Sequence, residues 1–498
     1  MTWQQNLPLF QIICPLMCAA VCSALKGKAA RAVMTVLTVL ECAASAILVH
    51  FTLTRNVSFV YAMGEIGAPF GNELRIGAVE AITELAFSVI LLFSILGGWR
   101  HLTRDVAPNR LNLYGSMICL LTAAMTAMVY TNDLFTAYVF IEIGTIAACA
   151  LICASNQGKT LFAAARYMIM NLMGSGLFLL GLSMLYCLTG HLLFPQLGES
   201  VLKLLKAESY NVPLYLSFLL MTMGIAIKSA LYPFHTWLPD AYGSAMATSS
   251  AVLSSIISKM YIFLLIKIFV RAAGTDVFAR RIEDVLFLYA VTGMIMGSVH
   301  AIRQRHFSRM VAYSSVAQIG YIFLGISLGT EMGMAAALYH ILAHSAAKSM
   351  LFLTAHQLRE VSGEEDTFRA LRGAGHRSPL AGAAFTVGAC SLVGIPGLGC
   401  FASKVFLAQA GVALGGWRMA LLLGALAIST LLNAAYMLRT VLTLYRENNE
   451  SIVQEKQTKV HDSAFAIAMV ALILLNVSLG LLGGPLMDII QQGFALFA

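Results

Sequence analysis

Apolar stretches of about 20 residues recur along this whole chain, and each is long enough to cross ~30 Å of hydrocarbon as a helix. The 498 residues are 59% hydrophobic and only 11% charged, whereas charged residues make up about 25% of an ordinary soluble domain. We therefore predict an all-α polytopic membrane protein with about 14 transmembrane helices. The predicted segments are 6–25, 32–53, 79–98, 112–130, 134–154, 162–188, 213–234, 243–270, 283–302, 310–329, 332–357, 380–408, 418–445 and 463–486.

The polar stretches between these segments are too short to bury a core of their own. Residues 1–498 are therefore predicted to form one integral membrane domain. The first apolar segment lacks both a basic start and a small-residue cleavage site, so we expect it to be retained in the mature protein.

The net charge of +8 predicts orientation rather than nucleic-acid binding. When loops are numbered by the segments they follow, the odd-numbered loops hold more than twice as many Lys and Arg as the even-numbered loops. By the positive-inside rule the odd loops are cytoplasmic and both termini lie on the outer side. Lys267 lies near a segment end, and we expect it to reach the interface.

A small set of ionisable residues lies deep inside the apolar segments. An ionised group at this depth costs at least a few kcal/mol, so such residues usually face a wet interior and mark a path for ions or protons. The set comprises Glu142, Lys228, Lys259, His340, His344, Lys348 and Lys404.

Two segments contain prolines that interrupt an apolar helix close to a lysine. Pro233 and Pro239 follow Lys228, and Pro396 precedes Lys404. Proline removes a backbone donor, so a break at membrane depth persists only where protein or water satisfies the freed groups. Simple kinks in packed helices are the structural alternative. Paired broken helices are typical of inverted-repeat transporters.

We therefore pair predicted segments 4–8 with segments 9–13 as two inverted repeats of five helices, each with one broken helix. The resulting divisions are N-terminal helices (1–110), a first repeat (111–271), a second repeat (282–446) and a C-terminal helix (447–498).

Glu142 has no basic neighbour in sequence. We predict that it pairs with Lys228, because each charge alone is costly in a low dielectric. A purely structural ion pair is the alternative. His340, His344 and Lys348 recur every four residues and so share one helix face, and neutral imidazole can both accept and donate a proton.

Other polar residues are candidates for accessory roles. They are His235, two residues after Pro233, and the acidic residues Glu41, Glu80 and Glu84. The ten cysteines show neither CxxC spacing nor a Cys/His cluster, so we predict no metal site.

Several sequence blocks resemble one family. KSALYPFHTWLPDAYGSAMATSSAVLSS is similar to the seventh and eighth helices of the antiporter-like subunits of respiratory complex I, membrane-bound hydrogenases and Mrp-type cation/proton antiporters. NDLFTAYVFIE, RMVAYSSVAQIGYIFLGI, YHILAHSAAKSMLFL and GIPGLGCFASKVF resemble the family's fifth, tenth, eleventh and twelfth helices.

The resemblance implies roles for the buried set. Glu142 and Lys228 correspond to an ion pair thought to gate proton loading, and Lys259 to a central lysine. His340, His344 and Lys348 fall on a relay, and Lys404 on the site near the outward exit. The loop before AYSS departs from the family pattern at His306 and Ser308, which puts local contacts there in doubt.

The resemblance also implies a multi-pass subunit of a prokaryotic cytoplasmic membrane complex that translocates protons, with Na⁺ as a second candidate cargo. No haem, iron–sulfur, flavin or nucleotide motif appears, so we predict no bound cofactor and no catalytic centre in this chain. Other membrane subunits, related antiporter-like subunits and a hydrophilic redox module are the expected partners. Two alternatives stay open, a non-transporting structural subunit and a stand-alone secondary carrier. The sequence does not distinguish among the three kinds of complex.

Overall fold

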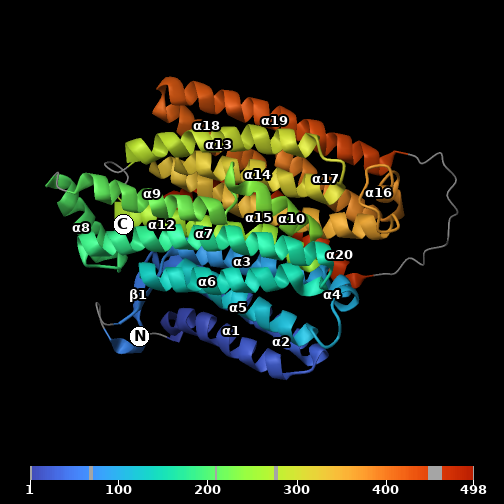
Figure 1. Ribbon diagram of the computed structural model, residues 1–498, viewed down its shortest axis with the longest axis horizontal. Coiled ribbons are helices and arrows are strands. Elements are labelled where there is room, and N and C mark those ends of the chain that lie inside the picture. Colours follow the sequence, from blue (N-terminus) through green and yellow to red (C-terminus); the bar gives the residue numbers. More distant parts are fainter. Residues whose placement is uncertain (1–2, 67–70, 208–209, 274–278, 447–461, 497–498) are drawn as a thin grey trace.

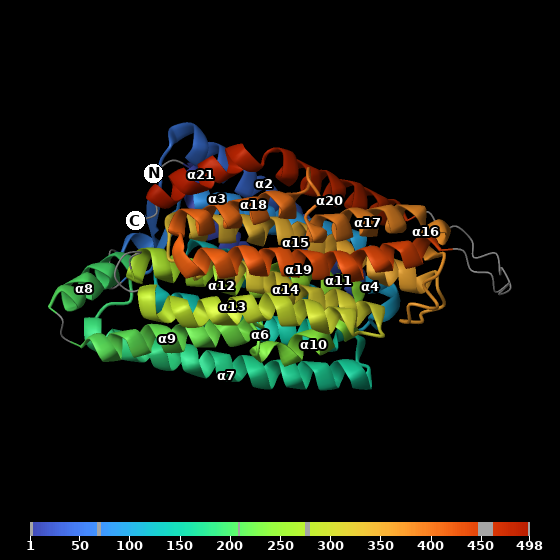
Figure 2. The ribbon, with the colours of Figure 1, turned by 90° about the horizontal axis from the view of Figure 1, so that it is seen from above.

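Long helices lying side by side make up nearly all of the computed structural model, which describes residues 3–66, 71–207, 210–273, 279–446 and 462–496. Figure 1 and Figure 2 show from two perpendicular sides that most helices follow one common direction. Among these residues, eleven helices are long and apolar enough to cross a membrane. The chain is an all-α polytopic membrane protein, as predicted.

The N-terminal part begins at one edge of the bundle, where its first two helices lie below the other helices in Figure 1. Its elements are the 3₁₀ turn η1 (Trp3–Asn6), α1 (Leu7–Ala24), α2 (Gly27–Arg55), β1 (Phe59–Ala62), the turn η2 (Met63–Glu65), β2 (Glu73–Ile76), α3 (Ala78–Gly97) and α4 (Trp99–Asp105). The two strands pair antiparallel, with Phe59 opposite Ile76. This hairpin joins α2 to α3.

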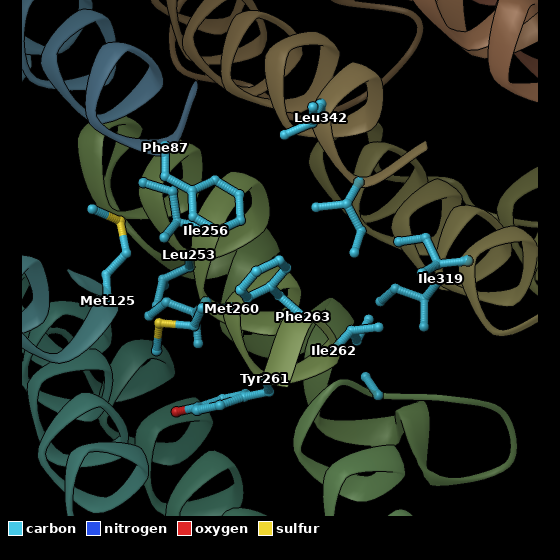
Figure 3. Packing of buried hydrophobic residues seen from close by; sticks show 14 of the residues in the cluster. Phe87, Met125, Leu253, Ile256, Met260, Tyr261, Ile262, Phe263, Ile319 and Leu342 are labelled. Atoms are coloured by element: carbon cyan, nitrogen blue, oxygen red, sulfur yellow. The ribbon is translucent and has the colours of Figure 1, made fainter. Parts of the chain in front are cut away.

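The middle of the chain contains a long helical segment that is almost entirely buried. Its elements are α5 (Leu111–Tyr130), α6 (Leu134–Ile152), η3 (Cys153–Ser155), α7 (Gly158–Thr189), α8 (Phe194–Lys206), α9 (Asn211–Lys228), η4 (Phe234–Trp237), α10 (Leu238–Ser244), α11 (Ala247–Val252), the π-helix η5 (Leu253–Ile257), α12 (Ser258–Ile268) and the π-helix η6 (Phe269–Ala273). The most apolar window of Ala247–Ala272 is buried along its whole length. Figure 3 shows the cause: apolar side chains such as Phe87, Met125, Ile319 and Leu342 converge on this segment.

The C-terminal part is centred on α15. Its elements are α13 (Ala279–Ile302), α14 (Phe307–Ile326), α15 (Glu331–Glu360), α16 (Ala374–Arg377), α17 (Pro379–Val393), α18 (Gly399–Leu414), α19 (Gly416–Tyr445), α20 (Ser463–Leu481) and α21 (Gly483–Ala495). Every residue of α15 from Gly333 to Ala355 is buried. It contacts α3, α11, α12, α14, α17, α18, α20 and α21. A polar side chain on this stretch therefore meets protein rather than lipid.

Both predicted breaks are present as interruptions between helices. α9 ends at Lys228 and the chain resumes as η4 after Pro233, while Pro239 lies in the first turn of α10, where a proline removes no helical hydrogen bond. Between α17 and α18, Gly394 and Gly397 adopt positive φ angles of 91° and 87°, which favour glycine.

Some predicted boundaries were wrong. The segment predicted at 243–270 begins inside α10, because α10 completes the broken helix before the chain turns into α11. The single C-terminal helix is two helices, α20 and α21. The number fourteen and the inverted pairing of the repeats stay predictions. The two labelled chain ends lie at the same end of the bundle in both views, while the side of the membrane stays a prediction.

Candidate functional site

Glu142 of α6 and Lys228 of α9 form an ion pair inside the bundle. Their Oε1 and Nζ atoms are 3.6 Å apart. The Lys228 side chain is fully buried, whereas that of Glu142 is 25% exposed. The Ser175 hydroxyl of α7 donates to Glu142, and Lys228 donates to the Thr145 hydroxyl at 2.9 Å. The pair predicted from the sequence is therefore in place, with two hydroxyl groups supporting it.

The end of α9 explains how Lys228 reaches its partner. Lys228 is the last residue of this helix, so the side chain leaves at the break rather than along a continuing turn. Its Nζ lies 5.5 Å from the centroid of the Tyr261 ring, and the Tyr261 and Thr145 hydroxyls are 3.1 Å apart. Tyr261 thus connects the pair to α12, the helix that carries Lys259.

Lys259 lies one residue after the start of α12, directly after the π-helix η5. The wider π turn departs from the usual hydrogen-bond ladder, and such turns are frequent at functional sites. Lys259 Nζ donates to the backbone carbonyl of Ser254 within that turn. Among the described residues no carboxylate forms an ion pair with this lysine, which is completely buried.

His340 and His344 stack along the face of α15. Their ring centroids are 5.8 Å apart and the planes differ by 18°. The Nδ1 of His340 is 2.8 Å from the hydroxyl of Ser403 in α18. Neither nitrogen of His344 has a hydrogen-bond partner among the described residues. One imidazole is thus fixed to α18, and the next is free to take a polar partner.

Lys348, one turn further along α15, points to α14. Its Nζ donates to the Val311 carbonyl at 2.7 Å and to the Ser314 hydroxyl at 2.6 Å. The predicted row of His340, His344 and Lys348 is therefore buried throughout. Its last member contacts a second helix that carries further polar groups.

Lys404 of α18 reaches back to the broken end of α17. Its Nζ donates to the carbonyls of Leu392 and Val393 at 3.0 and 2.9 Å. A helix C-terminus carries a partial negative charge that favours a cation. The ammonium therefore stabilises the end that the proline break leaves unpaired.

Tyr321 of α14 links Lys404 to His340. Its ring lies 5.1 Å from Lys404 Nζ and stacks on His340 at a centroid distance of 5.4 Å. Sequence reasoning missed this residue, because nothing near position 321 signals a charge. Ser403 and Thr145 were also missed, although their places next to Lys404 and three residues after Glu142 were visible signals.

The accessory candidates lie apart from this row. His235 stacks on Tyr232 at 5.0 Å and approaches His300 at 5.7 Å. Glu80 pairs with Arg75 at 3.0 Å near the start of α3. Glu41 and Glu84 are buried, and one carboxylate oxygen of each has no hydrogen-bond partner among the described residues.

Lys267 does not reach the interface, contrary to prediction. It is fully buried, and its Nζ donates to the carbonyls of Val129 and Thr131 at 2.7 Å. These carbonyls lie at and just after the end of α5, where the last helical carbonyls lack partners. Lys267 therefore supplies hydrogen-bond donors to the carbonyls at the end of α5, and it reaches them because the two helices pack together.

Removing the Thr145 hydroxyl tests its support of the Glu142–Lys228 pair, with a moderate expected effect. Thr145→Val keeps the side-chain shape but removes the acceptor of the Lys228 hydrogen bond. A hydrogen bond to a charged group contributes roughly 1.5 kcal/mol, which corresponds to about a tenfold change in rate. For the proton translocation that the family resemblance implies, we expect the rate to fall by about that factor with assembly unchanged, measured by dye quenching in proteoliposomes. Wild-type translocation would exclude a supporting role for this hydroxyl.

The fold and the site together define a class: a polytopic membrane protein with a row of buried lysines and histidines that begins and ends at interrupted helices. A family profile described as "NADH:quinone oxidoreductase/Mrp antiporter, TM" matches residues 131–432. The NADH-quinone oxidoreductase subunit N of Desulforudis audaxviator is 32% identical over 452 residues, covering 88% of this chain and 86% of the relative. The chain belongs to the NADH:quinone oxidoreductase/Mrp antiporter family of membrane subunits.

Further relatives agree with this placement. Subunit N of Desulforamulus reducens is 27% identical over 82% of this chain and 84% of its own length. A chain of the archaeal membrane-bound sulfane sulfur reductase has a TM-score of 0.87 at 24% identity, over 99% of this chain and 98% of that chain. A chain of the Mrp complex from Dietzia sp. DQ12-45-1b also has a TM-score of 0.87 at 22% identity, over 99% of this chain and 97% of that chain. These two structures share the fold.

Proposed function

We propose that this chain is the proton-translocating subunit of a larger membrane complex. The observation that carries the proposal is the buried row itself: four lysines and two histidines lie inside the bundle, and the single carboxylate paired with them is Glu142 among the described residues. Burial of so many ionisable groups is costly, so it favours a function in charge transfer over a purely structural one.

Loading of the row depends on the pair of Glu142 and Lys228. A nearby carboxylate favours the protonated form of a lysine. When the two side chains separate, the ammonium of Lys228 loses this support and releases its proton toward Lys259. The Thr145 hydroxyl of α6 accepts from Lys228 and contacts the Tyr261 hydroxyl of α12, so these two groups connect Lys228 to the helix that carries Lys259.

Transfer beyond Lys259 uses buried polar groups that have no hydrogen-bond partner in the part of the chain that the structure describes. They include the hydroxyls of Ser258, Ser315 and Ser345, the amide of Gln318 and both nitrogens of His344. Buried polar groups of this kind are commonly satisfied by water. Water between these groups would carry a proton along α15, where neighbouring sites titrate as a coupled set.

Energy for transport comes from a partner in this proposal. The named relatives are subunits of NADH-quinone oxidoreductase, and the structural neighbours belong to a sulfur reductase and an Mrp complex. We propose the same setting here: related membrane subunits in the cytoplasmic membrane, and a redox module or an ion gradient as the driving force. Protons are the proposed cargo, and the proposal assigns no resident cofactor to this chain.

Lys259→Met tests the proposed function at its centre. Methionine keeps the length of the side chain and removes the ammonium, so we expect a loss of more than 90% of proton translocation by the native complex in liposomes. Lys203→Met, on the exposed face of α8, is the matched control and should translocate at the wild-type rate. Normal translocation by Lys259→Met would favour the structural subunit instead.

The same liposomes test whether the transported ion is H⁺ or Na⁺. Translocation that persists at the same rate when Na⁺ is replaced by choline supports protons as the cargo. A requirement for Na⁺ together with Na⁺ uptake would overturn that assignment.

A further inference from the structure

The polar face of α15 continues past Lys348 to the end of the helix. At the same spacing of four residues follow Phe352, His356 and Glu360. Residues at this spacing lie one above another on a helix. The face therefore carries titratable groups on both sides of a single aromatic residue.

His101 of α4 joins this second group. Its Nε2 lies 3.7 Å from Oε2 of Glu360, and its ring centroid is 6.4 Å from that of His356. His101 is buried, while His356 and Glu360 are partly exposed. The Nε2 atoms of both histidines have no hydrogen-bond partner among the described residues. The cluster thus extends from the protein surface into the bundle.

Arginines hold the carboxylate of Glu360 in this cluster. Arg100 and Arg104 lie 3.0 and 3.1 Å from its Oε1. With Oε1 held by these two contacts, Oε2 faces His101. The cluster lies at the arginine-rich end of the bundle, near α4 and α16 in Figure 1, which the positive-inside rule predicts to be cytoplasmic. Protons to be exported would come from this side.

Phe352 separates the cluster from Lys348. The Nζ of Lys348 lies 5.7 Å from the centroid of the Phe352 ring, and the ring of Tyr242 lies 6.2 Å from that of Phe352. Lys348 and His356 are eight positions apart, so about 12 Å of helix lies between them. Proton transfer over such a distance needs bridging groups or water, and the Phe352 ring lies in this interval.

We propose that His101 and His356 take up protons at the arginine-rich end and deliver them to Lys348, and that the Phe352 ring closes this path between turnovers. Each neutral imidazole accepts a proton at one ring nitrogen and releases one from the other, which leaves the opposite tautomer, and rotation of the ring restores the starting state. This inference rests on the proposed function and adds to the same proton row a second point of entry at Lys348, besides the loading at Lys228.

The test uses the native complex in liposomes, with the variants His101→Gln/His356→Gln and His356→Ala. We expect the double variant to translocate protons at least fivefold more slowly, and added imidazole to restore part of the rate of His356→Ala. His376→Gln, an exposed histidine at the same end, is the matched control and should behave as wild type. Phe352→Ala should raise the passive proton leak.

Wild-type translocation by the double variant would overturn the intake route. A slowed His356→Ala that imidazole does not restore would also overturn it, because that result describes a structural histidine. Lys348→Met separates the two proposals. If this variant is blocked while the double histidine variant is normal, only the intake fails; if Lys348→Met translocates normally, the proposed function fails as well.

Discussion

Glu142→Ala or Lys228→Ala is expected to reduce proton translocation by about a hundredfold or more while the complex still assembles. Without Glu142 the protonated form of Lys228 loses the carboxylate that favours it, and a rise of about 3 kcal/mol in the barrier to transfer corresponds to more than a hundredfold in rate. The structure gives the reason: Lys228 is fully buried, and Glu142 is its one ion-pair partner among the described residues. Dye quenching in proteoliposomes measures the rate, and native gel electrophoresis measures assembly.

The double variant Glu142→Ala/Lys228→Ala makes this test sharper. It leaves no uncompensated buried charge, so we expect better assembly than in either single variant, with translocation still lost. Lys203→Met, on the exposed face of α8, is again the control, because this side chain has no place in the row. Translocation at the wild-type rate in either single variant would remove the pair from the mechanism.

Lys404→Arg is expected to abolish proton release while the fold is kept. Arginine can still donate to the carbonyls of Leu392 and Val393, so the broken end of α17 stays stabilised. The guanidinium remains protonated at any ordinary pH, so it cannot pass a proton on. We expect less than a tenth of wild-type translocation with normal assembly, measured in the whole complex driven by its own reaction.

Lys404→Glu and Lys404→Met complete this series. A carboxylate exchanges protons, so Lys404→Glu should keep part of the translocation if Lys404 is an exchange site. Lys404→Met removes both the donor and the charge, and should block release. Normal translocation by Lys404→Arg would instead assign this lysine to stabilising the helix end alone.

Much of the fold followed from local pattern. Apolar stretches of membrane-spanning length and the prolines at 233 and 396 predicted the long helices and both interruptions. Boundaries were less accurate where one segment runs into the next without a polar loop. The join of α10 to α11 and the division of α20 from α21 are such places, because composition there changes little across the turn.

The site was predicted as a set of residues, and its contacts were not. The four-residue spacing on one helix and the free energy cost of an ionised group at membrane depth indicated the lysines, the histidines and Glu142. The π-helix before Lys259 and the aromatic link through Tyr321 have no signal in sequence. His101 was overlooked because α4 is short and lies far in sequence from His356.

The sequence by itself determined that this protein lies in a membrane and which ionisable groups enter it, because both depend on transfer energies that single residues and short segments carry. Tertiary structure decided what each group does there. Lys228, Lys267 and Lys404 are all lysines in apolar surroundings, yet the first pairs with a carboxylate, the second satisfies the end of α5, and the third satisfies the end of α17. Those partners come from distant segments, and only the packing of the helices brings them within reach.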